Sequence, residues 1–291
     1  MKAICAIIKD EHIFLEEWIE WHLGLGFDAI HLFEDKGSKS HEEICEKYSN
    51  VYLRRYEDDD EVMFILQDQG SSQRQLSLYD WFARKYKGAY NWVAFIDIDE
   101  FFFFSEGYDL NKLCKEFENY KSVLLNWRMM GANGHIDRPE GDITKAYTKE
   151  CGSVVSIDKE WMYKSFVNLD KFEGFHNLHR AYGSVNTHFS PNYKQLHYDK
   201  AWLNHYFTKS WEDWCERIFK RGGTLRGHRK LADFFLCNTD MAHLKNELIT
   251  SVAHRIPTDT YWIDKERGII AGGNVKKIME LNKGLYGKDI R

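Results

Sequence analysis

The chain has 291 residues, 43% of them hydrophobic and 29% charged, a balance that predicts a folded globular protein and excludes a disordered one. Its formal net charge is -5 and its Lys and Arg residues are scattered along the chain, which excludes nucleic acid as an expected partner. The six cysteines are widely spaced without a CxxC pair, so we expect reduced thiols in a cytoplasmic protein.

The N-terminal residues, MKAICAIIKDEH, contain one early lysine and a short apolar run that meets charge at Lys9. This pattern predicts neither a secretory signal nor a membrane anchor. No later segment has the apolar length needed to span a bilayer. We therefore expect membrane association to be peripheral at most.

Strands and helices alternate over the first hundred residues. Strands are predicted where short apolar runs are bounded by turn residues, and helices where apolar residues recur every three or four positions. The predicted strands are 3–8, 29–33, 51–56 and 92–104, and the predicted helices are 11–27, 41–48 and 71–87. This order predicts an α/β fold with a mostly parallel, Rossmann-like central sheet flanked by helices.

The second half of the chain has a less regular pattern. The segment KSVLLNWRMM predicts a strand over 121–130, GANGHIDRPEG a loop over 131–141, and KSWEDWCERIFKRGG a helix over 209–223. No linker is evident. We expect one main domain over residues 1–222 and an α-rich C-terminal extension over 223–291 that packs on it.

The segment WVAFIDIDEFFFF, residues 92–104, places three acids in an otherwise apolar run. Alternation along a strand predicts that Asp97 and Asp99 point to one side and Glu100 to the other, as a structural partner. Two close carboxylates repel each other unless a cation lies between them, and Mg²⁺ and Mn²⁺ prefer such oxygen ligands. Because ligands bind at the carboxyl ends of parallel strands, Asp35, after the second strand, is expected at the same edge.

Several ordered blocks carry a family resemblance: AIIKDEHIFLEEWIEWHLGLGFDAIHLFED, WVAFIDIDEFF, NWRMMGANGH, WMYKSFV and LNHYFTKSWEDW. Together they resemble the GT-A fold glycosyltransferases, and among these family 92 and its bacterial, family 2-like relatives. The blocks extend from about Ala3 to Gly222. The resemblance implies an enzyme that transfers a hexose from a nucleoside-diphosphate sugar, with UDP-galactose favoured, to a glycan or glycolipid acceptor with inversion.

The resemblance also implies Mn²⁺ or Mg²⁺ as the cofactor. Asp97 would face the donor ribose and the metal shell, and Asp99 would be a metal ligand. His205, in LNHYFTKS, matches a late histidine that completes the metal shell, and imidazole suits Mn²⁺. Lys209 would neutralise the leaving diphosphate. The alternative readings are a core or surface histidine and an exposed lysine at a helix start.

The donor pocket is expected around the first two strands. Ile8 and Lys9 would line the base pocket, and Asp35 corresponds to the acid that contacts the base or ribose in this fold. Arg74 lies on the helix before the acidic strand, where a donor contact is plausible. The alternatives are a turn-forming aspartate before Gly37 and a solvated helix face.

Sugar contacts are expected from two groups of residues. Glycines in the loop 131–135 permit a close backbone approach to a sugar or phosphate, although a simple turn explains them equally well. The tryptophans Trp127, Trp161 and Trp202 offer surfaces for stacking, although tryptophans in apolar segments more often serve packing.

An inverting transfer needs a carboxylate that takes the proton of the acceptor hydroxyl. The sequence offers two candidates, Asp213 in WEDW and Asp233 in RKLADFF. Each is also consistent with an ordinary acid on a helix surface.

Two other functions remain open from the residues alone. A haloacid-dehalogenase-type phosphatase would use Asp97 as its nucleophile and Asp99 as acid and base, but Glu100 and phenylalanines stand where that family has Thr or Val. A non-catalytic sugar-binding module would use the metal for recognition only. The spacing of His176 and His179 in FHNLH is a weak signal for zinc.

Overall fold

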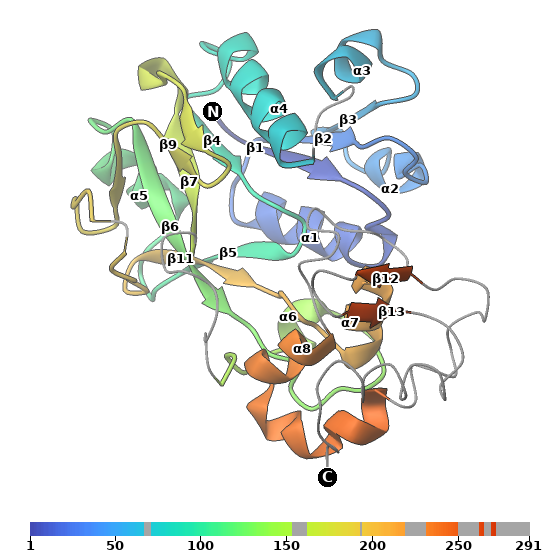
Figure 1. Ribbon diagram of the computed structural model, residues 1–291. Coiled ribbons are helices and arrows are strands. Elements are labelled where there is room, and N and C mark those ends of the chain that lie inside the picture. Colours follow the sequence, from blue (N-terminus) through green and yellow to red (C-terminus); the bar gives the residue numbers. More distant parts are fainter. Residues whose placement is uncertain are drawn as a thin grey trace. The chain divides into compact units, whose positions relative to one another are not determined.

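The structure, a computed structural model, describes residues 1–66, 71–152, 162–192, 194–218, 231–249, 262–264 and 269–271. The chain divides into two compact units. The first comprises Met1–Met129 and Ser156–Tyr206, and the second comprises Met130–Val155 and Phe207–Arg291. Figure 1 shows the elements of both.

The first unit contains a nine-stranded sheet whose N-terminal part is parallel. Its strands in chain order are β1 (Lys2–Ile8), β2 (Ala29–Glu34), β3 (Val51–Arg55) and β4 (Trp92–Phe95), and they lie in the order β3-β2-β1-β4. Their pairings are all parallel. The connections contain α1 (His12–Gly24), α2 (Glu42–Cys45), α3 (Asp60–Leu66) and α4 (Ser71–Lys85). This is the predicted alternation, and α3 is an additional helix that the sequence analysis does not predict.

The sheet continues from β4 with strands of mixed direction. The order β4-β7-β6-β11-β5 is formed by β5 (Glu100–Phe104), β6 (Ser122–Met129), β7 (Tyr163–Asn168) and β11 (Ala201–His205). The short β10 (Ser184–Asn186) pairs with β6, α5 (Leu110–Glu116) precedes β6, and β8 (Phe175–Asn177) pairs with β9 (Arg180–Ala181). Five of the eight pairings in the large sheet are parallel. The predicted fold class, α/β with a mostly parallel sheet flanked by helices, is confirmed.

The segment 92–104 is not the single strand that the sequence predicts. β4 ends at Phe95, the chain turns, and β5 begins at Glu100 with a different, antiparallel partner, β11. In the turn the Glu100 amide donates to the Asp97 carbonyl oxygen at 3.0 Å, and the Asp97 amide donates to Oε2 of Glu100 at 3.2 Å. Strand alternation therefore does not set the directions of these acids.

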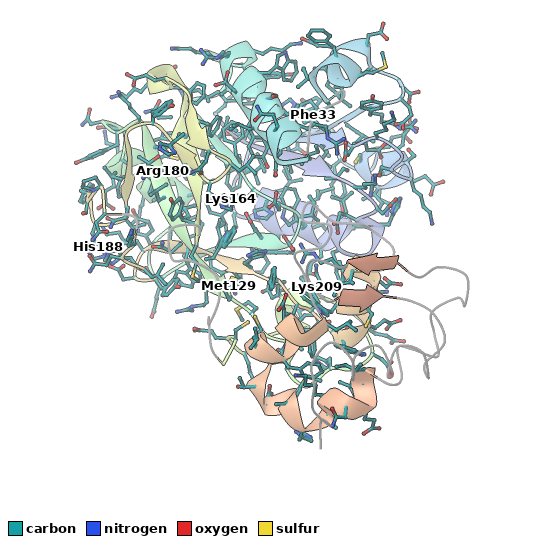
Figure 2. The ribbon with its side chains drawn as sticks, in the orientation of Figure 1. Phe33, Met129, Lys164, Arg180, His188 and Lys209 are labelled. Atoms are coloured by element: carbon teal, nitrogen blue, oxygen red, sulfur yellow. The ribbon has the colours of Figure 1, made fainter. Side chains whose placement is uncertain are left out.

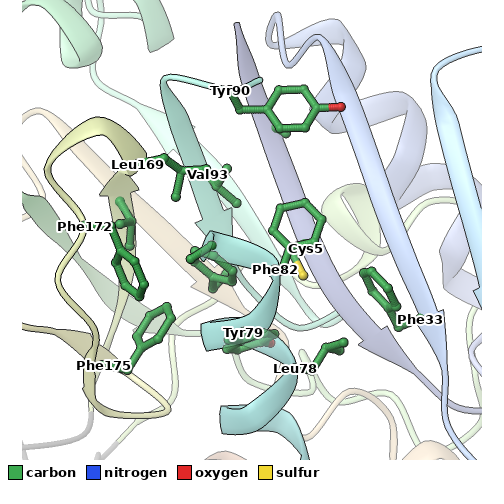
Figure 3. Packing of buried hydrophobic residues seen from close by; sticks show 14 of the residues in the cluster. Cys5, Phe33, Leu78, Tyr79, Phe82, Tyr90, Val93, Leu169, Phe172 and Phe175 are labelled. Atoms are coloured by element: carbon green, nitrogen blue, oxygen red, sulfur yellow. The ribbon is translucent and has the colours of Figure 1, made fainter. Parts of the chain in front are cut away.

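One face of the parallel strands packs against α3 and α4. The close view in Figure 3 shows the packing against α4. Alternate residues of the strands take part, including Cys5 of β1 and Phe33 of β2. They meet Tyr79 and Phe82 of α4, which are fully buried. At about 25 cal/mol per Å² of buried apolar surface, such aromatic packing fixes the position of α4 on the sheet.

The helix α1 is tied to β5 through its tryptophans and a histidine. Nε1 of Trp18 and of Trp21 donate to the carbonyl oxygens of Glu100 and Phe102, each at 2.8 Å. The helix buries Phe14, Leu15, Trp18, Ile19 and His22, and ends at Gly24, within the segment 11–27 predicted as a helix. These hydrogen bonds attach α1 to the backbone of β5, the phenylalanine-rich strand that follows the acids.

His22 predicts a pH-dependent stability. It is buried, its Nδ1–H donates to the Trp18 carbonyl oxygen at 2.7 Å, and its Nε2 accepts from the Phe102 amide at 3.3 Å. Burial lowers the pKa of His22 to about 3, whereas an unfolded histidine has a pKa of about 6.5. Between these values the unfolded state binds more protons, so stability is lost as the pH falls below 6.5. Urea unfolding measures this as the difference in the free energy of unfolding between the wild type and His22→Gln. From pH 7 to pH 5, the wild type is expected to lose about 2 kcal/mol relative to the variant. An equal pH dependence in both proteins would contradict this.

The described part of the second unit consists of short helices, loops and one pair of strands. It contains α6 (Ile143–Ala146), α7 (Trp211–Glu216), α8 (Leu231–Cys237), the 3₁₀ helix η4 (Thr239–Leu244) and the paired strands β12 (Trp262–Asp264) and β13 (Ile269–Ala271). Trp211 and Trp214 of α7 pack against Phe234 and Phe235 of α8. The predicted helix over 209–223 is described as far as residue 218, and Gly222 and Gly223 lie outside the described residues.

Among the described residues, no helix has the length and apolar character required to cross a membrane.

Candidate functional site

The carboxyl ends of β1, β2 and β4 meet at one edge of the sheet. The register pairs Ile8 with Glu34, and the Asp35 amide donates to the Ile8 carbonyl oxygen at 2.9 Å. Two neighbouring residues at the start of α4 then join this edge to the acidic turn. Arg74 donates to Asp35 at 2.9 Å, and Gln75 donates to Oδ1 of Asp97 at 2.7 Å. Asp35 and Asp97 thus lie at a common edge, as the sequence predicts.

The ion pair of Asp35 and Arg74 is partly exposed and incompletely hydrogen-bonded. The exposed fractions of the side chains are 14% for Asp35 and 21% for Arg74. Oδ1 of Asp35 and Nε of Arg74 are shielded from solvent and make no hydrogen bond within the described part of the chain. A ligand with hydroxyl or amide groups would satisfy this acceptor and this donor by displacing part of the ion pair that shields them.

The segment after β1 is held by a buried network. Nδ1–H of His41 donates to Glu34 at 2.7 Å, and Nε2 of His41 accepts from the Glu11 amide at 3.0 Å. Ile8 is buried, and Nζ of Lys9 donates to the Lys36 carbonyl oxygen at 2.7 Å. Ile8 and Lys9 thus lie beside Asp35 in the chain fold, and their contact with a donor base stays a prediction.

Asp97 is paired with a buried lysine that the sequence analysis did not select. Nζ of Lys164, on β7, lies 2.9 Å from Oδ2 of Asp97 and 3.7 Å from Oε1 of Glu100. The side chain of Lys164 is 2% exposed, that of Glu100 is fully buried, and that of Asp97 is 37% exposed. Lys164 is labelled in Figure 2. Asp97 therefore has one oxygen on Lys164 and the other on Gln75.

Asp99, Glu100 and His205 form a second, buried group beside this pair. One ligand atom from each lies within 4.8 Å of the others. Nε2 of His205 is 3.5 Å from Oδ1 of Asp99, and both side chains are 8% exposed. The antiparallel register of β5 and β11 sets this group, because it pairs Glu100 directly with His205.

The charges of these residues shift one another's proton affinities. Burial raises the pKa of Glu100 well above its ordinary value, and the nearby Lys164 ammonium opposes this only in part. For Asp97, burial alone would raise the pKa, but Lys164 outweighs it and holds the pKa below its ordinary value. Burial would lower the pKa of Lys164, but the carboxylates of Asp97 and Glu100 keep it raised. Asp97 and Lys164 are therefore a charged pair, and Glu100 carries negative charge only at a cost.

The residues present fit a hard divalent cation. Oε1 of Glu100 is shielded from solvent and makes no hydrogen bond within the described residues, with Lys164 as its neighbour at 3.7 Å. Carboxylate oxygens with one imidazole are a donor set that suits Mn²⁺ and also Mg²⁺ with water. Asp99 and His205, both predicted ligands, are brought together with Glu100, whereas the assignment of Asp97 as a third ligand stays a prediction.

Trp127 packs against both His205 and His179. The ring centroids of Trp127 and His205 are 4.4 Å apart, and those of Trp127 and His179 are 5.1 Å apart. Trp202 stacks on Phe103 and donates Nε1–H to Asn204 at 2.9 Å, which indicates packing. Trp161 lies outside the described residues.

The histidines of the FHNLH segment have separate environments. His179 donates Nδ1–H to the Tyr163 carbonyl oxygen at 3.0 Å, whereas His176 is exposed. Burial, with the Lys164 charge as a further cause, lowers the pKa of His179 to about 3. Within the described part of the chain, these two histidines do not belong to a group of three possible metal ligands.

The other predicted site residues belong to the second unit. Lys209 is buried and has φ +52°, an uncommon backbone conformation for a residue with a side chain. Asp213 accepts from Nε of Arg138 at 2.6 Å and from Oγ of Ser210 at 2.8 Å. Asp233 is half-buried in the first turn of α8. The roles of Lys209, Asp213 and Asp233 in catalysis stay predictions.

Asp213 also takes part in the N-terminal cap of α7, so replacing it is expected to lower the free energy of unfolding. Its side chain and that of Ser210 form a capping box at the start of the helix. Asp213→Asn is expected to lower the free energy of unfolding by about 1–3 kcal/mol, because Arg138 loses its buried charged partner. Urea unfolding measures this, with exposed Asp240→Asn as the control. Wild-type stability combined with lost transfer would instead support a role as the base.

Packing against Asn238 explains the first glycine of the loop 131–135, Gly131. A Cβ on Gly131 would lie 2.9 Å from Oδ1 of Asn238, which accepts from the Ala132 amide at 2.6 Å. The chain turns at Asn133 and Gly134, which both have positive φ. Close packing within the second unit therefore explains Gly131 without a ligand.

Comparison with known proteins identifies the family. The model of a family described as glycosyltransferase family 92 matches residues 4–240. The chain belongs to glycosyltransferase family 92. The prediction of a glycosyltransferase is thereby confirmed at the level of the family.

A curated relative from Ricinus communis, a glycosyltransferase family 92 protein, is 22% identical over 150 residues. The match covers 50% of this chain and 26% of the relative, so the chain spans about a quarter of the length of that relative.

Two solved structures are similar over most of the chain. A putative nucleotide-diphospho-sugar transferase from Desulfovibrio desulfuricans G20 is 9% identical, with 85% of this chain and 97% of that chain covered and a TM-score of 0.34. The galactosyltransferase LgtC, in complex with donor and acceptor sugar analogs, is 13% identical, with 82% and 96% covered and a TM-score of 0.36. At TM-scores this low, no site residue is transferred from either structure.

Proposed function

We propose that the chain transfers a hexose from a nucleoside-diphosphate sugar to a glycan or glycolipid acceptor, with inversion at the transferred carbon. The observation that carries this proposal is the edge where two successive residues of α4, Arg74 and Gln75, bind Asp35 and Asp97. Asp97 is also paired there with Lys164 of β7. It supplies contacts for a nucleoside next to a group of charged residues suited to phosphates. Family membership supports glycosyl transfer over the phosphatase and the sugar-binding module.

Asp35 and Arg74 would bind the nucleoside. Oδ1 of Asp35 accepts and Nε of Arg74 donates, and both atoms lack partners within the described residues. A carboxylate oxygen matches a ribose hydroxyl, and a guanidinium N–H matches a carbonyl oxygen of a base or a phosphate oxygen. We favour uridine diphosphate as the nucleotide and galactose as the sugar, on the resemblance to the family alone.

Asp99, Glu100 and His205 would hold a divalent cation, with Asp97 as the further predicted ligand. When bound, such a cation supplies positive charge that stabilises the departing diphosphate. Lys164 fixes the Asp97 carboxylate and adds one positive charge within the same acidic group. Asp99, Glu100, Lys164 and His205 are buried, so their electrostatic effects on a bound donor are screened less than at the surface.

The acceptor proton would be taken by Asp213 or Asp233, the two predicted bases. Asp213 already binds Arg138 and Ser210, so its role as a base would require one of these contacts to loosen. A comparison of Asp213→Asn with Asp233→Asn, measuring donor binding and transfer separately, identifies the base. The base is the residue whose loss abolishes transfer and spares donor binding.

The test is a thermal-shift screen of nucleoside diphosphates and their sugars, with and without Mn²⁺. We expect stabilisation by a uridine nucleotide that depends on Mn²⁺, because a ligand that binds only the folded state raises the unfolding temperature. Arg74→Ala should abolish the shift, whereas Arg84→Ala, on the exposed side of the same helix in an ion pair with Asp80, should retain it.

No shift with any nucleoside diphosphate would overturn the proposal. A phosphorylated Asp97 after incubation with a phosphate ester would instead support the phosphatase. Binding of free sugars without binding of nucleotides would support the sugar-binding module.

A further inference from the structure

A second group of possible metal ligands lies in the first unit, outside the residues proposed to bind the donor. His188, His197 and Asp199 belong to the connection from β10 to β11, and one ligand atom from each lies within 4.8 Å of the others. His188 is labelled in Figure 2. The metal predicted from the sequence and the function proposed above involve none of these residues.

The three side chains already face one another. Nε2 of His188 lies 2.9 Å from each carboxylate oxygen of Asp199. The rings of His188 and His197 stack with their centroids 3.9 Å apart and an angle of 20° between their planes. Two imidazolium rings in this position would repel each other, so the stack favours at least one neutral imidazole.

His197 offers an imidazole nitrogen without a partner in the described part of the chain. Its Nε2 is shielded from solvent and makes no hydrogen bond within the described residues. A shielded imidazole nitrogen without a hydrogen-bond partner is costly unless a ligand binds it.

Two buried asparagines hold the backbone on either side of the group. Oδ1 of Asn186 accepts from the amides of His188 and Ser190 at 2.9 and 3.1 Å. Oδ1 of Asn126, on β6, accepts from the His197 amide at 2.9 Å. The Cα positions of the two histidines are therefore fixed by the sheet, while the side chains of His188 and Asp199 stay 45% and 53% exposed and can adjust.

We propose that His188, His197 and Asp199 bind a zinc ion. Two imidazoles and a carboxylate are a donor set that zinc uses, with distances of about 2.0–2.2 Å to nitrogen and oxygen. A tetrahedral ion at this distance needs ligand atoms about 3.4 Å apart and imidazole planes that meet at the ion, so the exposed His188 ring would rotate out of its stack on His197. The fourth position is open to water.

The bound ion would join the two ends of the β10–β11 connection. His188 follows β10 by two residues, and Asp199 precedes β11 by two residues. β11 ends at His205, which belongs to the buried group with Asp99 and Glu100. We therefore expect zinc to stabilise the first unit and not to take part in glycosyl transfer.

Cobalt(II) titration of the metal-free full-length chain tests the site, because four-coordinate cobalt absorbs visible light and zinc displaces it. Asp99→Asn serves as the background, so that binding at the acidic group is weakened in every sample. We expect one cobalt ion per chain. In this background His197→Ala should weaken cobalt and zinc binding by at least about 100-fold, since even residues that only support metal ligands contribute about 10- to 100-fold.

Exposed His176→Ala, in the same unit, is the matched control and should bind as the background does. Asp199→Asn is a second variant at an exposed position, and thermal unfolding without metal checks that each protein is folded. Unchanged affinity and stoichiometry in folded His197→Ala and Asp199→Asn would overturn the proposal, and so would the absence of any visible cobalt band in the background. Neither result bears on donor binding, which the nucleotide screen tests separately.

Discussion

Replacing Lys164 with methionine is expected to lower the free energy of unfolding by about 3 kcal/mol. Loss of one partner of a buried ion pair costs about 3–5 kcal/mol, because the other charge stays buried without compensation. Nζ of Lys164 is 2.9 Å from Asp97 and 3.7 Å from Glu100, and the lysine side chain is only 2% exposed. We expect the lower end of the range because the side chain of Asp97 is 37% exposed to water. Urea unfolding at pH 7 measures the effect.

The control is Lys115→Met, which removes an ion pair with Glu118 at the surface. The side chains of that pair are 78% and 50% exposed, so its loss should cost about 0–1 kcal/mol. Adding Asp97→Asn to Lys164→Met should recover part of the lost stability, because the uncompensated carboxylate is then neutral. A loss below 1 kcal/mol for Lys164→Met would show that water enters the group and that Lys164 is not needed to balance its charge.

The parallel half of the sheet was predictable because its signals are local. β1 and β2 are short apolar runs, and α4 carries Leu78 and Phe82 at helical spacing on the face that meets the sheet. The order of such elements determines a parallel sheet, and the sheet determines which strand ends meet. For this reason Asp35 was placed correctly beside the acidic segment without any knowledge of tertiary contacts.

The acidic segment itself was misread because its break depends on a distant partner. An apolar run from Trp92 to Phe104 has the pattern of one long strand. β4 pairs with β1, but β5 pairs with β11, which lies about a hundred residues later in the sequence. No residue in the turn indicates that β4 and β5 pair with different strands, since neither glycine nor proline occurs there.

Lys164 and Gln75 were missed for a related reason. Each is an ordinary residue in sequence, and only the fold brings them to Asp97. The signal that was available is the lysine in the strand YKSFVN, where every residue is buried. A lysine is almost never buried without a partner, so its presence in such a strand predicts an acid nearby.

Asp99→Asn is expected to reduce metal-dependent glycosyl transfer by about 100-fold or more. Asparagine keeps the shape of the buried side chain and removes the negative charge, and the loss of one electrostatic contact to a transition state costs about 10²–10³ in rate. Asp99 is the member of the group that both the sequence and the structure place beside His205, at 3.5 Å. The measurement is Mn²⁺ binding by electron paramagnetic resonance together with transfer from a uridine-diphosphate sugar.

Two further substitutions decide which acid completes the metal shell. If Glu100 is the third ligand, Glu100→Gln should weaken Mn²⁺ binding as much as Asp99→Asn does, while Asp97→Asn should bind Mn²⁺ nearly as the wild type does. If Asp97 is the ligand, as the sequence motif implies, Asp97→Asn should weaken Mn²⁺ binding as much as Asp99→Asn does. Glu100→Gln should then bind Mn²⁺ nearly as the wild type does. Asp80→Asn, in the exposed ion pair of α4, is the control for the loss of one acid. Unchanged Mn²⁺ stimulation in Asp99→Asn would remove the metal from this group altogether, because no reading of the site leaves Asp99 out.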